Sequence, residues 1–271
     1  MAKYALCIGI NDYPGTESDL AGCVNDADDW SAELARRGFS TGRLIDRQAT
    51  GKAMRSGIQK ILAGAVAGDL VVVQYSGHGS FVPDEDGDEP DGTDECLCPY
   101  DVRSRGPITD DELFDLYSAR KTGVKLVMIS DSCNSGTVSR FAPITTPPDA
   151  RGVKARHTSV RFLPPAAFLT KRETARFGIR RAVQRSSPPG RNASLLLAGC
   201  QETEYSYDAY FQGRPNGAFT FVALQTLAKL AKSATYADWY EAIRNVLPSR
   251  EYPQTPNLYG PKSMKKWKVL E

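Results

Sequence analysis

Two short apolar runs constrain the fold of this chain more than any other feature. Residues 69–76 (DLVVVQYS) and 126–130 (LVMIS) carry β-forming, mostly apolar side chains at consecutive positions. Such runs predict strands that are buried on both faces, as in a parallel sheet covered by helices. Each run ends in small and polar residues, at 77–80 (GHGS) and at 131–136 (DSCNSG). Ligands bind at the carboxyl ends of strands in such sheets, so these two ends mark the candidate site.

Strands and helices alternate along most of the chain. This alternation predicts an α/β fold with a mostly parallel sheet and right-handed crossovers. We expect a single domain, residues 1–271, with an insert at about 139–191. The expected strands are 3–10, 39–46, 69–76, 126–130 and 194–200, and the expected helices are 20–38, one that follows the N-cap Thr50, 218–230 and 236–247.

The composition is that of a globular protein, with 41% hydrophobic and 24% charged residues. No apolar run approaches the roughly 18 residues of a membrane span, so we expect no membrane partner. We interpret the first apolar run as a strand and not as a signal peptide. The six cysteines are then expected to be reduced thiols in the cytoplasm. With only two histidines and a Cys96-x-Cys98 spacing, a structural zinc site is not predicted.

Charge is spread unevenly along the chain. Between residues 139 and 191, twelve Lys and Arg stand against two acidic residues, although the whole chain has a net charge of only +2. This segment is rich in proline and poor in apolar residues, which predicts an exposed, poorly ordered insert. It lacks interleaved aromatic residues in a folded frame and would offer mainly non-specific phosphate contacts, so we expect no specific nucleic-acid partner. The acidic loop 84–94 fails the EF-hand pattern because Glu89 takes the place of the sixth-position glycine.

A thiol and an imidazole can meet at the predicted sheet edge. His78 and Cys133 both follow apolar strands, and the other histidine, His157, lies in the basic insert. An imidazole can lower the pKa of a thiol and protonate a leaving amine, so the pair predicts nucleophilic catalysis. The backbone N–H groups of Gly79 and Cys133 can bind the developing oxyanion. Taken singly, a buried structural cysteine and a Gly-His-Gly turn are the commoner explanations.

Six stretches in this order resemble the caspase-like cysteine peptidases, and within them the type I metacaspases and the bacterial orthocaspases. The ordered set is spread along most of the chain outside the basic insert and is far more specific than any one motif. The spacing agrees with it, since a histidine lies about 50 residues before the cysteine in caspases. The stretches are 5–12 (ALCIGIND), 22–27 (GCVNDA), 75–80 (YSGHGS), 131–136 (DSCNSG), 196–207 (LLAGCQETEYSY) and 217–220 (GAFT).

The resemblance implies a caspase-like three-layer sandwich and a catalytic dyad of His78 and Cys133. It also implies a primary pocket for Arg or Lys, in which Asp26 and Asp131 supply the charge. Carboxylates at the bottom of a pocket pair well with guanidinium or ammonium groups. The resemblance implies that Cys23 and Ser76 line the same pocket. The expected partners are therefore proteins or peptides with Arg or Lys at the cleavage site.

Family metacaspases often use calcium through four aspartates. Asp94, Asp110 and Asp111 match three of them, but Arg140 stands at the fourth position. A cation there would repel Ca²⁺, so we expect that no cofactor is required. Metacaspase-like chains are usually monomers, and we expect a monomer here.

The sequence thus predicts a cysteine endopeptidase that cuts after Arg or Lys. The Arg-rich insert follows the nucleophile closely, so we hypothesise that the enzyme cuts itself there or that the insert occludes the pocket. The alternative is a catalytically idle caspase-like domain that serves as a regulatory or binding module. A third possibility is a calcium-binding module built on the acidic loop.

Overall fold

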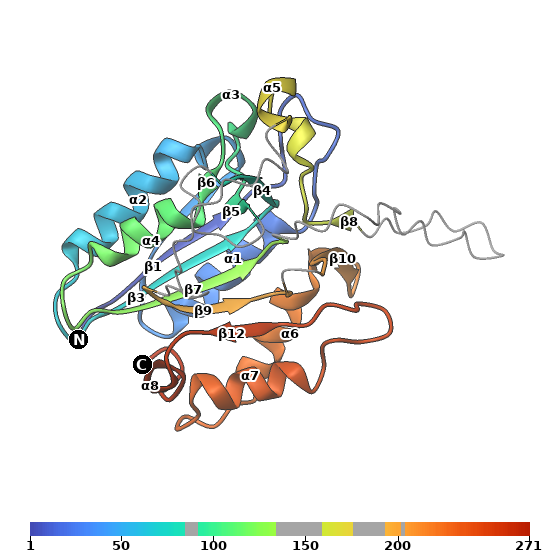
Figure 1. Ribbon diagram of the computed structural model, residues 1–271. Helices are drawn as coiled ribbons and strands as arrows, with labels where there is room; N and C mark the ends of the chain where they lie inside the picture. The colour runs from blue at the N-terminus through green and yellow to red at the C-terminus, as the bar shows by residue number, and fades with distance from the viewer. Residues whose placement is uncertain (85–91, 134–158, 176–192, 202–203) are drawn as a thin grey trace.

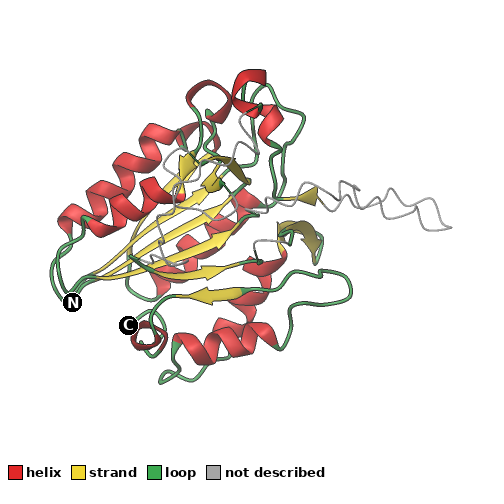
Figure 2. Cartoon of the chain, in the orientation of Figure 1, coloured by secondary structure: helices red, strands yellow, loops and turns green. Residues whose placement is uncertain are grey.

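The computed structural model describes residues 1–84, 92–133, 159–175, 193–201 and 204–271, and a six-stranded sheet forms its centre (Figures 1 and 2). The strand order is β12-β9-β7-β3-β1-β2. Four of the five pairings are parallel, and β12 pairs with β9 in the antiparallel sense. The strands are β1 Lys3–Gly9, β2 Ser40–Ile45, β3 Leu70–Ser76, β7 Lys125–Asp131, β9 Leu195–Ala198 and β12 Asn257–Tyr259. The predicted mostly parallel α/β fold is confirmed.

Helices cover both faces of the sheet and make it the middle of three layers (Figure 1). In β3, Leu70 and Val72 point to one core while Val71 and Val73 point to the other, because successive side chains alternate across a strand. The first core is packed by α1 Cys23–Arg36, α6 Ala218–Leu227 and α7 Tyr236–Arg244, and the second by α2 Gly51–Gly64 and α4 Asp110–Ser118. Burial of each such apolar side chain stabilises the fold by about 1.5–3 kcal/mol.

Threonine caps begin several of these helices. The Thr50 hydroxyl accepts a hydrogen bond from the backbone N–H of Ala53 at 3.2 Å, as its predicted N-cap role requires. Thr109 and Thr235 form capping boxes with acidic residues at the third helical position. These caps satisfy backbone donors that the first turn of a helix leaves without intrahelical partners.

Two small antiparallel sheets lie outside the central sheet and were not predicted. Their strands are short and lack a clean alternation of polar and apolar residues, which is the signal that sequence patterns offer. One sheet consists of β4 Gly79–Pro83, β5 Thr93–Leu97 and β6 Ile108–Thr109, and the other of β8 Ser159–Val160, β10 Tyr207–Phe211 and β11 Arg214–Gly217. The remaining short helices are η1 Asp46–Gln48, α3 Val102–Arg105, η2 Pro165–Ala167, α5 Lys171–Thr174 and α8 Lys262–Lys265.

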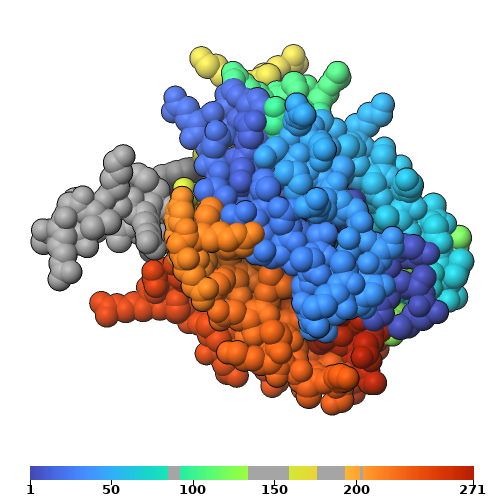
Figure 3. Space-filling view, turned by 180° about the vertical axis from the view of Figure 1, so that it is seen from behind, coloured from blue at the N-terminus to red at the C-terminus, as the bar shows by residue number. Residues whose placement is uncertain are grey.

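The second small sheet ties the C-terminal part of the chain to α1. Asn216 in β11 donates through its side-chain amide to the Asp26 carboxylate at 3.0 Å. Figure 3 shows the two parts meeting, with orange C-terminal residues against blue N-terminal ones. The pairing brings Asp26, which is fully buried, next to the carboxyl edge of the central sheet.

The described part of the basic insert corrects one prediction. Residues 159–169 are mostly buried or half-buried, and the side chains of Arg161 and Leu163 have no exposed surface, whereas most of residues 170–175 are exposed. The prediction of an exposed insert is therefore wrong for residues 159–169. The reason is specific recognition, since the Arg161 guanidinium meets buried carboxylates that composition alone cannot reveal. Residues 139–158 and 176–191, with Arg140, lie outside the described residues.

Candidate active site

Neighbouring strands carry His78 and Cys133 to the same edge of the sheet. Ser76 at the end of β3 pairs with Asp131 at the end of β7. His78 and Cys133 each lie two residues beyond these partners. The two predicted catalytic residues therefore leave adjacent strands in equal register.

Cys133 is fully buried at this edge. Its Sγ accepts a hydrogen bond from the backbone N–H of Ser206 at 2.6 Å. It packs in an apolar cluster with Phe81, Phe162 and Cys200. The thiol is thus held in one place and shielded from water by aromatic rings.

The His78 ring is fixed by its surroundings. Its Nε2 lies 2.5 Å from the carbonyl oxygen of Ser18, which identifies Nε2 as the protonated nitrogen because a carbonyl can only accept. The Tyr13 ring centroid lies 4.6 Å from that of His78, and the Tyr13 hydroxyl accepts from the His78 backbone N–H at 2.7 Å. The other ring nitrogen, Nδ1, is buried and has no hydrogen-bond partner among the described residues. Nδ1 is therefore available to take and give a proton.

Burial also sets the charge of this ring. It lowers the pKa of His78 from 6.5 to about 4, while the nearby carbonyl groups of Ser18 and Arg161 act in the opposite direction. The imidazole is therefore neutral at pH 7.

The carbonyl oxygen of Arg161 lies between the two N–H groups that the sequence proposes for an oxyanion. It accepts from Gly79 N at 3.0 Å and from Cys133 N at 3.1 Å. The backbone N–H of Arg161 in turn donates to the carbonyl of Ser206 at 2.9 Å. The two N–H groups thus converge on one carbonyl oxygen, as donors that bind an oxyanion would.

The Arg161 side chain fills a buried acidic pocket. Its Nη2 lies 2.6 Å from Asp26 Oδ2, and its Nη1 lies 3.1 Å from Asp131 Oδ2. A third carboxylate, Asp208, lies 2.9 Å from Nη2. Burial lowers the pKa of the Arg161 guanidinium, but Asp131 and Asp26 outweigh it and raise the pKa well above its usual value. The pocket therefore holds a permanent cation.

Each carboxylate is oriented by donors of the fold as well as by Arg161. Asp131 accepts from the backbone N–H and the hydroxyl of Thr220 at 2.9 and 2.8 Å. Asp26 accepts from the backbone N–H of Gly217 at 3.0 Å. Burial raises the pKa of Asp26 to about 6, with Arg161 opposing the shift. Backbone and side-chain donors of the fold thus hold both carboxylates in addition to Arg161.

The other two predicted pocket residues lie at its margin. Cys23 is buried at the start of α1, where burial raises the pKa of its thiol well above 9.0 and the charge of Arg161 opposes this. Ser76 neighbours Asp131 in register, and its hydroxyl accepts from the Gln74 side-chain amide at 2.8 Å. Ser76 thus packs beside the pocket while its hydrogen bond runs along β3.

Sequence reasoning missed two members of this site. Asp208 directly follows the last residue of the 196–207 motif, and its carboxylate also accepts from the backbone N–H of Ala21 at 2.8 Å. A lone acidic residue in a tyrosine-rich stretch carries no local signal of that contact. Arg161 is one of twelve basic residues in the insert, and nothing in its flanks distinguishes it from the others.

The three aspartates proposed for calcium do not fit a metal site in the described part of the chain. Asp94 is buried in β5, while Asp110 and Asp111 are exposed in the first turn of α4. Within the described ranges, no three His, Cys, Asp or Glu side chains gather where they could hold an ion. We therefore assign no step to calcium.

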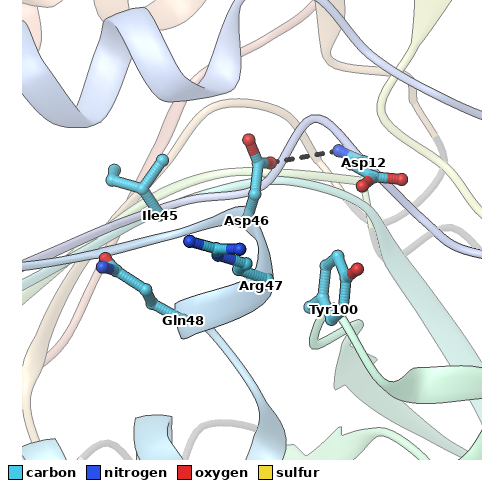
Figure 4. A pocket seen from close by; sticks show the side chains of 6 residues that line it. All are labelled: Asp12, Ile45, Asp46, Arg47, Gln48 and Tyr100. Carbon is cyan, nitrogen blue, oxygen red and sulfur yellow. Dashed lines mark hydrogen bonds between the residues drawn. The ribbon is translucent and has the colours of Figure 1, made fainter.

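A separate hollow lies at the end of β2 (Figure 4). Its volume is about 340 Å³, and the carboxylate of Asp46 at its edge accepts from the backbone N–H of Asp12 at 3.1 Å. None of the described residues that line it is a predicted catalytic or pocket residue. The lining consists of Asp12, Ile45, Asp46, Arg47, Gln48 and Tyr100.

Two general features of the described chain complete the picture. All six cysteines fall within it, and all are buried free thiols. None of the helices in the described ranges combines the length and apolarity that crossing a membrane requires.

The model of the caspase domain matches residues 2–267 of this chain. The chain belongs to the caspase-domain family of cysteine peptidases. Its similarity to metacaspase-1 of Mycosarcoma maydis, 30% identity over 94% of this chain and 69% of that protein, assigns it to the metacaspases. Metacaspase-7 of Arabidopsis thaliana is 44% identical over 50% of this chain and 35% of its own length. The chain thus spans about a third of that relative.

Solved structures agree with the assignment of the fold. A Geobacter sulfurreducens protein of known crystal structure superposes with a TM-score of 0.74 at 28% identity, covering 100% of this chain and 98% of the other. Caspase-1 of Spodoptera frugiperda superposes with a TM-score of 0.54 at 13% identity, covering 95% and 84%. At that identity the second likeness concerns the fold alone. The predicted caspase-like sandwich is confirmed.

Proposed function

We propose that this metacaspase is an endopeptidase that cuts peptide bonds after Arg or Lys through Cys133 and His78. One observation supports this most directly. Arg161 lies with its guanidinium among three carboxylates while its carbonyl accepts from Gly79 N and Cys133 N. A single arginine residue of the chain thus meets the conditions for side-chain recognition and for attack at the carbonyl.

In the proposed reaction, the Cys133 thiol transfers its proton to Nδ1 of His78 and attacks the scissile carbonyl carbon. The N–H groups of Gly79 and Cys133 stabilise the charge that develops on the oxygen. His78 then protonates the leaving amine, and water hydrolyses the thioester to release a carboxylate and the thiol. Burial lowers the pKa of His78, so its protonated form gives up the proton to the leaving amine more readily than an exposed imidazolium would.

The proposal extends to the substrates and surroundings of the enzyme. The partners are proteins or peptides with Arg or Lys at the cleavage site, among them the basic insert itself. No cofactor takes part in the proposed reaction, and the chain acts as a monomer. Six free thiols favour a cytoplasmic location.

The test is hydrolysis of matched fluorogenic peptides that end in Arg, Lys or Asp. Wild type, Cys133→Ala and Arg161→Gln should be compared, because Arg161 occupies the pocket of the uncut chain. Turnover of Arg and Lys peptides that is absent in Cys133→Ala supports the proposal. Turnover of the Asp peptide alone overturns the pocket assignment.

A catalytically idle module remains the competing function. It predicts that no peptide is cleaved by any of these proteins, even after the insert has been nicked. The buried dyad and the occupied pocket favour the peptidase, because an idle module has no need for aligned N–H donors on a carbonyl.

A further inference from the structure

Two buried tyrosine hydroxyls hold both backbone polar groups of His78. The Tyr13 hydroxyl accepts a hydrogen bond from the His78 N–H at 2.7 Å, and the Tyr75 hydroxyl donates to the His78 carbonyl oxygen at 2.6 Å. Both tyrosine side chains are buried. His78 itself lies between the end of β3 and the start of β4, where no strand pairing holds its N–H. The backbone of the histidine is therefore placed by side chains.

The two hydroxyls also contact each other. They share a side-chain hydrogen bond, and a Cβ added to Gly77 would lie 2.6 Å from each of them. Cys98 completes the arrangement, since its N–H donates to the His78 carbonyl at 3.0 Å and its carbonyl oxygen lies 2.9 Å from the Tyr75 hydroxyl. The hydrogen bonds thus form a closed ring from the His78 N–H to Tyr13, on to Tyr75 and back to the His78 carbonyl.

The loop that carries Tyr13 also holds the imidazole. Ser18, five residues further along this loop, places its carbonyl oxygen 2.5 Å from Nε2 of His78. The Asp19 carboxylate accepts from the Tyr13 N–H at 2.9 Å and closes the loop between the two contacts. One short loop thus fixes the backbone of His78 through Tyr13 and its ring through Ser18.

We propose that Tyr13 and Tyr75 are positioning residues, whose hydroxyls hold the backbone of His78 where Nδ1 can exchange a proton with Cys133. This inference rests on the proposed peptidase function. Neither hydroxyl takes part in the chemistry, because both are engaged with His78 and with each other. Burial raises the pKa of both tyrosines well above 10.0, so both keep their protons at neutral pH.

The Tyr13 hydroxyl is the more critical of the two. Without it, the buried N–H of His78 has no partner, and the backbone has to shift until that group finds one. A displacement of about 1 Å in a catalytic group can lower the rate about 100-fold. The acidic pocket is unaffected, because backbone donors elsewhere hold Asp26 and Asp131. The loss should therefore appear in kcat and not in KM.

The test measures kcat and KM for an Arg peptide with the full-length Arg161→Gln protein and with variants made in it. Tyr13→Phe keeps the ring against the imidazole and removes only the hydroxyl, so kcat should fall about 30- to 100-fold while KM stays within about twofold. Tyr75→Phe should lower kcat only about 3- to 10-fold, because the Cys98 N–H still serves the His78 carbonyl. The double variant should lose at most about twofold more than Tyr13→Phe, because either change opens the same ring.

Tyr236→Phe is the matched control. The Tyr236 hydroxyl is also buried and accepts from a backbone N–H, that of Leu270 at 3.2 Å, but it lies in the core on the other face of the sheet. Both substitutions should lower the urea midpoint of unfolding by similar amounts, while only Tyr13→Phe lowers kcat. The inference is overturned if Tyr13→Phe keeps kcat within twofold of its parent protein, or if Tyr236→Phe loses as much.

A readout without turnover separates this inference from the proposed function. The chain has two histidines, so comparison with His157→Gln identifies the ring signals of His78 in NMR spectra. In Tyr13→Phe the pKa of His78 should move from about 4 toward 6.5 as the ring leaves its buried place, and in Tyr236→Phe it should not. An unchanged His78 pKa in Tyr13→Phe overturns the inference at any level of activity. If the pKa moves as expected but no protein hydrolyses any peptide, the proposed function fails and the hold of the hydroxyls on His78 stands.

Discussion

The backbone N–H of Cys133 donates to the carbonyl oxygen of Arg161 at 3.1 Å. The residue that carries the nucleophile therefore also positions the carbonyl beside it. This contact joins residues 28 positions apart, and it depends on the side-chain match between Arg161 and the carboxylates of Asp26, Asp131 and Asp208. Removing one partner from a buried ion pair costs about 3–5 kcal/mol, so the pocket and the carbonyl position are energetically linked.

The pocket leaves no room for a side chain larger than that of glycine at position 217. A Cβ at this position would lie 2.5 Å from Arg161 Nη1 and would also collide with the Asp131 carboxylate. Gly217→Ala should therefore lower kcat/KM for an Arg peptide at least 100-fold and expel Arg161 from the pocket. Peptide hydrolysis measures the first effect, and limited proteolysis of residues 159–163 measures the second.

Gly64→Ala is the matched control for this substitution. Gly64 lies in the last turn of α2, and a Cβ there would meet nothing within 4 Å. This variant should keep wild-type activity and gain a little helix stability. Equal activity of the Gly217→Ala and Gly64→Ala proteins would contradict the role given to Gly217.

The sequence predicts the strands that carry the catalytic candidates better than it predicts the arginine that fills the pocket. The ends of β3 and β7 are predictable because buried strands leave continuous apolar runs before His78 and Cys133. The position of Arg161 is not predictable, because β8 has two residues and its partners lie 47 and 49 positions further along the chain. The role of Asp208 in the pocket is not predictable for the same reason, since it depends on contacts with distant residues and not on its neighbours in the sequence.

Arginine should be preferred to lysine in the pocket. The two terminal nitrogens of Arg161 contact different carboxylates, Nη1 with Asp131 and Nη2 with Asp26 and Asp208. A single ammonium cannot match this fork, and charged hydrogen bonds contribute about 1.5–3 kcal/mol each. The kcat/KM ratio of matched Arg and Lys peptides should therefore exceed about 10, measured with the Arg161→Gln protein.

The Asp208→Asn substitution checks the cause of that preference. It removes one charge next to Nη2 while keeping the shape of the side chain, so kcat/KM for the Arg peptide should fall about 10- to 100-fold. The Lys peptide should lose less, and the Arg-to-Lys ratio should shrink. A ratio that does not change would mean that Asp208 acts only on the fold.

Activity should be independent of calcium. The carboxylates of Asp94, Asp110 and Asp111 do not gather into a metal site in the described chain, and Arg140 replaces the fourth acidic residue. Hydrolysis of the Arg peptide by the Arg161→Gln protein should differ less than twofold between added calcium and a chelator. Arg140→Asp is the informative second protein, because stimulation of this variant alone would show that Arg140 suppresses a calcium response.

The stability of the uncut chain should fall in acid because of His78. Its pKa is about 4 in the folded protein and 6.5 when exposed, so the unfolded state binds the proton first as the pH falls. The stabilisation is complete above pH 6.5 and is lost between pH 6.5 and 4, a change of about 3 kcal/mol. The comparison uses a Cys133→Ala background, which cannot cut itself. Between pH 6.5 and 4, the free energy of unfolding measured in urea should fall by this amount more in the protein with His78 than in the His78→Asn variant. Parallel pH curves for the two proteins would mean that the pKa of His78 is the same in the folded and the unfolded protein.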